Sequence, residues 1–171
     1  MEKKNIFVVG GSSGIGLEIV RILSQDGHNV FVGSRKNDQL KGLEGVNHLK
    51  LDVTAESLRF DGLPNALDGM VYCPGTIQLR PFQRLSIDDF MADLNVNYLG
   101  AVKSIQGVIT RLKKSKSVSS VVLFSTVAVN TGMPFHASIS GAKGAVEGLT
   151  RSLAAEFAPR IRFNAIAPSL T

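Results

Sequence analysis

Short apolar stretches alternate along the chain with segments in which apolar residues recur every three or four positions. The short stretches are rich in β-branched residues, which favour strands, and lie at 6–9, 30–32, 48–51, 70–73, 118–124 and 161–167. Helical spacing separates several of them, at 17–23, 102–112 and 145–157. Because the strands are almost continuously apolar, as strands buried on both faces are, the pattern predicts a parallel sheet with helices on its faces.

No linker, internal repeat or low-complexity tract interrupts this alternation in the sequence. We therefore expect one α/β domain over residues 1–171, built as a doubly wound Rossmann-type sheet. The segment 59–66, which contains Gly62 and Pro64, has the weakest regular pattern, and we expect no long helix there.

The composition excludes several classes of protein. With 44% hydrophobic and 19% charged residues, the sequence has a globular balance and not that of a disordered chain. A single cysteine, Cys73, excludes an internal disulfide and a cysteine-cluster zinc site, and we expect no metal. No apolar run approaches the roughly 18 residues of a membrane span. A glycine cluster directly follows Ile6–Val9, unlike a secretory signal, so we expect a cytoplasmic protein that does not bind membranes.

The net charge of +5 raises the question of nucleic-acid binding. The basic residues are scattered, however, and the densest run, 113–116, follows a predicted helix, where cations complement the negative end of the helix dipole. Aromatic residues are not interleaved with these charges, as they are in single-strand binders. The sequence therefore predicts no nucleic-acid partner.

A glycine-rich loop follows the first predicted strand and opens the first predicted helix. Such a junction binds phosphate, because backbone N–H groups and the helix dipole face the anion and missing side chains let a pyrophosphate approach. An ordinary tight turn is the alternative, but the position at the first strand–helix junction favours a dinucleotide. The residues expected to line the site are Gly10, Ser12, Ser13, Gly14, Ile15 and Gly16.

The second predicted strand leads into Ser34, Arg35 and Lys36, with no carboxylate at its tip. In this architecture an acidic residue there binds the ribose 2′-hydroxyl of NAD, whereas an arginine accommodates the 2′-phosphate of NADP. Arg35 can form a forked contact with a phosphate and Ser34 can donate to it, which favours NADP(H). Solvated charges at the start of the next helix are the alternative interpretation.

Several collinear motifs resemble those of the short-chain dehydrogenase/reductase family. They are the glycine loop with its Gly-x-x-x-Gly-x-Gly spacing, Leu51–Thr54, Val96–Gly100, the helix that carries Lys143, and Arg162–Pro168. The resemblance implies hydride transfer between NADPH and a small carbonyl or alcohol substrate. It also implies that Asp52, beside Val53, holds the adenine amino group, and that Gly75 lies in the loop after the fourth strand at the cofactor.

The family's chemistry uses a Tyr-x-x-x-Lys pair, a serine thirteen residues before the tyrosine, and an asparagine on a preceding helix. By resemblance, Lys143 binds the nicotinamide ribose, Asn97 positions it, and Thr126 replaces the serine that holds the substrate oxygen. Ile139 stands where the tyrosine is expected, and isoleucine cannot transfer a proton. His136 is the best substitute donor, since histidine exchanges protons near neutral pH, although a solvated loop histidine is the alternative. The hydroxyls of Ser125, Ser138 and Ser140 are weaker candidates.

The fourth strand leads into a second departure from the family, Tyr72-Cys73-Pro74-Gly75 in place of Asn-Asn-Ala-Gly. Tyr72 either stacks on the cofactor or fills the core. The resemblance further implies a homodimer or homotetramer that pairs through helices at about 97–114 and 139–158. It also implies a substrate-covering part beyond the sixth strand, which these 171 residues lack.

Two functions therefore remain open. The first is an NADP-dependent oxidoreductase with a non-standard proton donor, favoured by the cluster of Lys143, Asn97 and Thr126. The second is a non-catalytic NADP-binding sensor or partner subunit on the same fold, favoured by Ile139.

Overall fold

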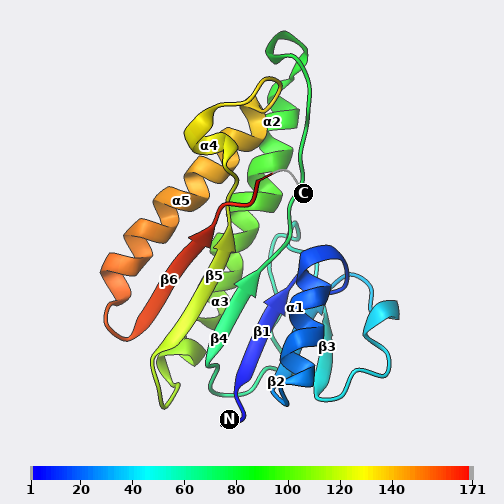
Figure 1. Cartoon of the computed structure of the whole chain (residues 1–171), viewed down its shortest axis with the longest axis vertical. Helices are drawn as coiled ribbons and strands as arrows, with labels where there is room; N and C mark the ends of the chain where they lie inside the picture. The colour runs from blue at the N-terminus through cyan, green and yellow to red at the C-terminus, as the bar shows by residue number, and fades with distance from the viewer. Residues whose placement is uncertain (1, 170–171) are drawn as a thin grey trace.

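The computed structural model describes residues 2–169. Its strands form one six-stranded sheet in the order β3-β2-β1-β4-β5-β6, with every neighbouring pair parallel (Figure 1). The strands are β1 (Asn5–Val9), β2 (Asn29–Ser34), β3 (Val46–Lys50), β4 (Gly69–Tyr72), β5 (Ser119–Phe124) and β6 (Ile161–Ile166). The expected Rossmann-type sheet is confirmed, and each strand boundary lies within two residues of its predicted place.

The helices connect these strands as crossovers. They are α1 (Gly14–Gln25), α2 (Ile87–Leu94), α3 (Gly100–Lys113), α4 (Ala128–Thr131) and α5 (Ala137–Phe157), with short 3₁₀ turns η1 (Asp38–Leu40) and η2 (Phe82–Arg84). A π-helical segment, η3 (Asn95–Leu99), joins α2 to α3. The sequence pattern did not predict α2 or α4, whereas segment 59–66 contains no helix, as expected.

Different helices cover the two faces of the sheet. On one face Phe7 of β1 packs with Val108 of α3 and Val146 of α5, and on the other Val8 packs with Val20 of α1. Figure 1 shows α1 on the opposite side of the sheet from α3. This alternation of neighbouring residues between two cores is what the period of a strand requires.

The start of α2 is fixed by a capping box. The Ser86 hydroxyl accepts from the Asp89 amide, and the Asp89 carboxylate accepts from the Ser86 amide at 2.9 Å. This reciprocal pair satisfies two backbone donors that a helix N-terminus otherwise leaves free. Within residues 2–169 there is no helix long and apolar enough to cross a bilayer.

Candidate cofactor and active site

The loops after β1 and β4 meet at the carboxyl ends of the strands, where the direction of the sheet's connections reverses. Gly10 has a φ of +76°, and a Cβ built on it would lie 2.9 Å from Pro74 Cδ in the loop after β4. A Cβ on Gly16 would collide with the Gly10 carbonyl oxygen. Gly10 is therefore required for the close approach of the two loops, and Gly16 for the close approach of α1 to the loop after β1, at the point where open α/β sheets bind their ligands.

The N-terminus of α1 is open to an anion. Ser13 is its N-cap, and within the described residues no side chain caps the helix and no acidic residue lies in its first turn. A Cβ on Gly14 would meet only open space. Because the first backbone N–H groups of a helix lack partners in the helix, this end fits the pyrophosphate of a dinucleotide. Ile15, beside it, has an exposed side chain.

Ser34 and Arg35 differ sharply at the tip of β2. The buried Ser34 hydroxyl donates to the Lys36 carbonyl at 2.7 Å and lies 3.1 Å from His48 Nε2. Arg35 is exposed and forms no hydrogen bond or ion pair to any residue that the structure describes. Arg35 is thus the side chain of the two that is free for a phosphate, while a contact from Ser34 requires the Lys36 bond to break.

Asp52 follows β3 as an exposed, ionised hydrogen-bond acceptor. Its Oδ1 accepts from the Thr54 amide at 3.0 Å and from the Thr54 hydroxyl at 2.7 Å, and these bonds hold the pKa of the carboxyl below its usual value. The neighbouring charges of Arg35 and Lys103 act in the same direction. The Val53 side chain is buried in the core, so a cofactor contact from this residue is limited to its backbone.

Gly75, Asn97 and Lys143 converge from three elements. Lys143, on α5, is 9% exposed, and its Nζ donates to the Phe124 carbonyl at 2.8 Å. A Cβ on Gly75 would lie 3.3 Å from Asn97 Oδ1 and 3.8 Å from Lys143 Nζ. The loop after β4, segment η3 and helix α5 therefore bring the predicted lysine, asparagine and glycine to one place.

The Asn97 side chain is held by its amide nitrogen. Nδ2 donates to the Asp93 carbonyl at 2.9 Å and to the Thr76 carbonyl at 3.2 Å. In a regular α-helix the Asp93 carbonyl would accept from the backbone N–H four residues later. Here the Asn97 side chain donates to it instead, and this replacement explains the widened turn of η3. Oδ1 is buried and accepts no hydrogen bond from the described residues. This orphan acceptor, beside Lys143 and Gly75, fits a polar ligand group.

Burial changes the acid–base properties at this point. Burial lowers the pKa of Lys143 to about 8, against the charges of Asp93 and Cys73, which raise it. Burial also raises the pKa of the Cys73 thiol to about 12, so the thiol is neutral near pH 7. Lys143 remains mainly an ammonium ion at neutral pH, able to donate to a ribose or substrate oxygen.

The remaining predicted catalytic residues, Thr126 and His136, have hydrogen-bond partners outside this cluster. Thr126 Oγ1 accepts from the Ala128 amide at 3.3 Å, at the start of α4. His136 Nδ1 lies 2.7 Å from the Pro134 carbonyl, which can only accept, so Nδ1 carries a proton and Nε2 is the nitrogen left for exchange. Among the described residues, neither side chain bonds to Lys143 or Asn97. Ile139, one turn before Lys143, is 4% exposed.

Three serines and Tyr72 have structural contacts. Tyr72 is buried in the core and its hydroxyl donates to the Val96 carbonyl at 2.6 Å, which supports the core-filling alternative over stacking on a cofactor. Ser125 donates to Glu147 Oε1 at 2.6 Å, Ser138 to Asp93 Oδ2 at 2.7 Å, and Ser140 lies 3.5 Å from the Ala128 carbonyl.

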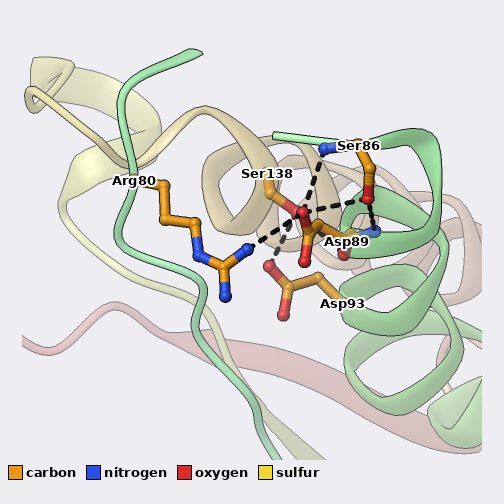
Figure 2. A network of polar contacts seen from close by, with 5 residues as sticks. All are labelled: Arg80, Ser86, Asp89, Asp93 and Ser138. Atoms are coloured by element: carbon orange, nitrogen blue, oxygen red, sulfur yellow. Dashed lines mark hydrogen bonds and ion pairs between the residues drawn. The ribbon is translucent and has the colours of Figure 1, made fainter. Parts of the chain in front are cut away.

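Sequence reasoning missed Asp93, the most deeply buried acid near the cluster. Figure 2 shows its carboxylate, on α2, beside Ser138 of α5, while Arg80 reaches Asp89 one turn earlier. The only local signal for Asp93 is its position four residues before Asn97, on a helix that the pattern did not predict.

The comparisons with known proteins agree with this geometry. The family model described as "short chain dehydrogenase" matches residues 4–171. The chain belongs to the short-chain dehydrogenase family. This confirms the family resemblance of the sequence motifs.

Curated relatives of this short-chain dehydrogenase are oxidoreductases. The 3-oxoacyl-[acyl-carrier-protein] reductase of Chlamydia pneumoniae is 28% identical over 180 residues, which cover 96% of this chain and 72% of the relative. A short-chain dehydrogenase/reductase of Botryotinia fuckeliana is 31% identical, with 96% and 70% covered. The bifunctional ribulose 5-phosphate reductase/CDP-ribitol pyrophosphorylase of Haemophilus influenzae is 26% identical over the whole chain, which spans 35% of that protein.

Solved structures have the same fold. The structure of ElxO with NADP bound superimposes with a TM-score of 0.85 at 26% identity, covering 99% of this short-chain dehydrogenase and 74% of ElxO. A short-chain dehydrogenase from Shigella flexneri gives a TM-score of 0.88 at 21% identity, with 98% and 72% covered, which supports the fold alone.

Proposed function

We propose that this short-chain dehydrogenase is an NADP-dependent oxidoreductase acting on a small carbonyl or alcohol substrate. The observation that carries the proposal is the convergence of Gly75, Asn97 and Lys143 beside an uncapped helix N-terminus. A bound NADPH would supply the hydride. The N-terminus of α1 binds the pyrophosphate, Asp52 accepts from the adenine amino group, and Lys143 donates to the nicotinamide ribose.

Preference for NADP over NAD rests on Arg35. Its exposed guanidinium forms no ion pair among residues 2–169, and the tip of β2, Ser34-Arg35-Lys36, contains no acid in its sequence. A planar guanidinium suits a phosphate monoester because it donates two parallel hydrogen bonds. ElxO, 26% identical, was solved with NADP bound.

The proton donor in this proposal is His136. Ile139 has no titratable group, whereas His136 lies three residues earlier, directly before α5, with Nε2 open for exchange. General acid catalysis contributes about 10²–10⁴-fold to a rate. His136→Ala is therefore expected to reduce turnover by that order and to leave NADPH affinity nearly unchanged. Full activity in this variant would refute the assignment and leave bound water or the Thr126 hydroxyl as the donor.

The test of the function has two steps. NADPH binding is measured first by fluorescence, and NADPH consumption is then followed with aldehydes, ketones and quinones. Binding with turnover of at least one carbonyl class supports the oxidoreductase. Absence of NADPH and NADH binding would overturn both functions. Lys143→Met is the matched negative variant, because it keeps an unbranched side chain of nearly the same length and removes the ammonium.

A non-catalytic NADP-binding protein is the second candidate, and Ile139 favours it. Ile139→Tyr distinguishes the two, because it introduces a phenol one turn before Lys143. If the wild type binds NADPH but turns over nothing while Ile139→Tyr gains activity, the non-catalytic function is the better one. Ile139→Phe controls for the added ring, whose insertion at a buried site costs about 1–3 kcal/mol through overpacking.

Self-association through α3 and α5 is part of the proposal. Gly141 and Gly148 are exposed on α5, and a Cβ on either would meet open space among the described residues. Glycine costs a helix about 1 kcal/mol relative to alanine, a cost that close packing of a second helix would offset. Analytical ultracentrifugation at micromolar concentration is expected to show a dimer or tetramer, and a monomer alone would contradict it. The cytoplasmic location stays a prediction, to be tested by cell fractionation.

A further inference from the structure

Asp93 is a fully buried carboxylate, 0% exposed, that contacts hydroxyl groups and no cationic side chain among the described residues. Its Oδ1 accepts from the Thr76 hydroxyl and its Oδ2 from the Ser138 hydroxyl, each at 2.7 Å. Removing a carboxylate from water costs several kcal/mol, and two neutral donors offset this only in part. A carboxylate buried at this energetic cost indicates that Asp93 has a function.

The position of Asp93 links three segments of the candidate site. Thr76 lies in the loop after β4, next to Gly75, and Ser138 lies on α5, directly before Ile139. The Asn97 amide donates to the Asp93 carbonyl oxygen and, at 3.1 Å, to the Thr76 hydroxyl. The carboxylate is therefore fixed on both oxygens at the junction of the elements that carry Gly75, Asn97 and Lys143.

The hydrogen-bonded cluster brings Asp93 close to Lys143. Thr76, which donates to Asp93 Oδ1 at 2.7 Å, directly follows Gly75, and a Cβ on Gly75 would lie 3.8 Å from Lys143 Nζ. Two ionisable groups act on the charge of Lys143 from this surrounding, Asp93 from α2 and Cys73 from the end of β4. Since the Cys73 thiol is neutral near pH 7, Asp93 is the group of the two that brings a negative charge. On the same helix Asp89 is already engaged, by Ser86 and by Arg80 at 3.5 Å (Figure 2). Ile139 adds no charge from α5.

We propose that Asp93 is a positioning residue whose buried carboxylate, held by Thr76 and Ser138, is the counter-charge that keeps Lys143 an ammonium ion. Asp93 does not touch the reacting atoms in this proposal, because its side chain is closed off from solvent. The inference rests on the proposed function only in assigning Lys143 to the cofactor. The charge relation itself exists in the protein without any ligand.

The test measures the titration of Lys143 directly, in the absence of cofactor. Protein carrying ¹³C-labelled lysine is titrated by NMR, and the Lys143 ε-methylene signal is assigned by its loss in Lys143→Arg. Asp93→Asn keeps the size of the side chain and supplies both an acceptor and a donor to the two hydroxyls. We expect Lys143 to titrate about one pH unit lower in this variant than in the wild type.

The matched control is Asp88→Asn, which removes the same charge from an exposed position of α2 and is expected to leave the Lys143 titration in place. An unchanged Lys143 titration in folded Asp93→Asn would overturn the proposal. If Asp93→Asn does not fold, the wild-type Asp93 ¹³C carboxyl shift at pH 7 decides: the ionised form supports the proposal and the protonated form overturns it. NADPH binding by the wild type tests the proposed function separately.

Discussion

At the scale of single residues, neighbours in the sequence have unequal access to a ligand. The Ser34 hydroxyl is committed to the Lys36 carbonyl, whereas the Arg35 guanidinium is exposed. A phosphate can therefore recruit Arg35 without breaking a bond inside the protein. For this reason the selectivity between the two dinucleotides is expected to depend on Arg35 and only weakly on Ser34.

Replacing Arg35 with aspartate tests this dependence. Arg35→Asp removes a charge-assisted contact and adds a negative charge, so NADPH affinity should fall about ten- to a hundredfold, or roughly 1.5–3 kcal/mol. NADH affinity should improve relative to NADPH. Fluorescence titration with both cofactors measures the ratio, and Lys41→Asp, an exposed lysine farther along the same connection, is the control. Parent-like NADPH binding in Arg35→Asp would show the assignment to be wrong.

Cys73 offers a second measurement at this scale. Because burial raises the pKa of its thiol to about 12, the reactive thiolate is scarce at pH 8, by about 10³-fold relative to an ordinary cysteine. Iodoacetamide is thus expected to modify the native protein at least about 10³-fold more slowly than the protein in guanidinium chloride. Mass spectrometry follows the reaction at this single cysteine. Equal rates in the two states would contradict the assigned burial effect.

Which residues can be predicted from sequence depends on how far away their partners lie. Lys143 and Asn97 stand in recognisable motifs, and the structure brings them together. Asp93 has its hydrogen-bond partners 17 and 45 residues away, at Thr76 and Ser138, so its role appears only once α2 and α5 pack. Tyr72 was equally undecidable, because its hydroxyl's acceptor, the Val96 carbonyl, belongs to another element.

At the scale of elements, the helix α2 and the π segment after it show where local patterns fall short. Ser86 and Asp89 have the spacing of a capping box, a start signal that was present in the sequence and overlooked. The widened turn of η3 has no such signal, because it arises from the bond of Asn97 to the Asp93 carbonyl. Regular periodicity predicts regular helices and misses a turn that a side chain reshapes.

Two glycines in helices test how tightly the elements pack. A Cβ on Gly107 of α3 would collide with the ring of Phe60, which itself packs edge-on against Phe7 at 6.0 Å between centroids. Gly107→Ala is expected to destabilise the protein by about 1–3 kcal/mol through overpacking. Gly144→Ala of α5, whose Cβ would make only an ordinary contact at 3.8 Å with Val129, should gain up to about 1 kcal/mol in helix propensity. Urea denaturation compares them, and a Gly107→Ala variant as stable as the wild type would contradict the packing.

At the scale of the whole molecule, the alternating pattern was sufficient to predict the sheet. The strands of a parallel sheet are buried on both faces, and β-branched apolar residues fit such strands well, so they mark each strand in the sequence. The distribution of helices over the two faces was not predictable to the same degree. Val71 and Val122 remain partly exposed on the face where α1 packs, and Ile166 is half exposed. Coverage depends on where each crossover lies, which a one-dimensional pattern does not encode.

The buried ammonium of Lys143 makes the stability of the whole molecule depend on pH. Its pKa is about 8 in the folded state and 10.5 as an ordinary lysine, so between these values the unfolded chain binds more protons. The contribution of Lys143 to stability therefore rises as the pH increases from about 8 to about 10.5. Cys73 and Tyr72 act in the opposite direction, because burial raises the pKa of each.

Comparison with Lys143→Met isolates this contribution. The free energy of unfolding of the wild type minus that of the variant should increase across pH 8–10.5, by up to about 3 kcal/mol. Urea denaturation at pH 7, 8, 9 and 10 measures the difference, in which the effect of Tyr72 cancels. If the difference in the free energy of unfolding stays constant with pH, Lys143 does not have a lowered pKa in the folded protein.

The central place of β1 in the sheet also governs how the chain can fold as it is synthesised. Asn5 pairs with Asn29 of β2, but Ile6 pairs with Gly69 of β4, and closure of the Phe7 face also requires Val108 and Val146. At about 5–20 residues per second, the ribosome needs roughly 4–15 s to travel from Gly69 to Val146. Throughout that interval the edge of a strand that is already synthesised and the apolar Phe7 face lack partners that have not yet been synthesised. The emerging chain, more than the completed sheet, is therefore the form that is exposed to aggregation.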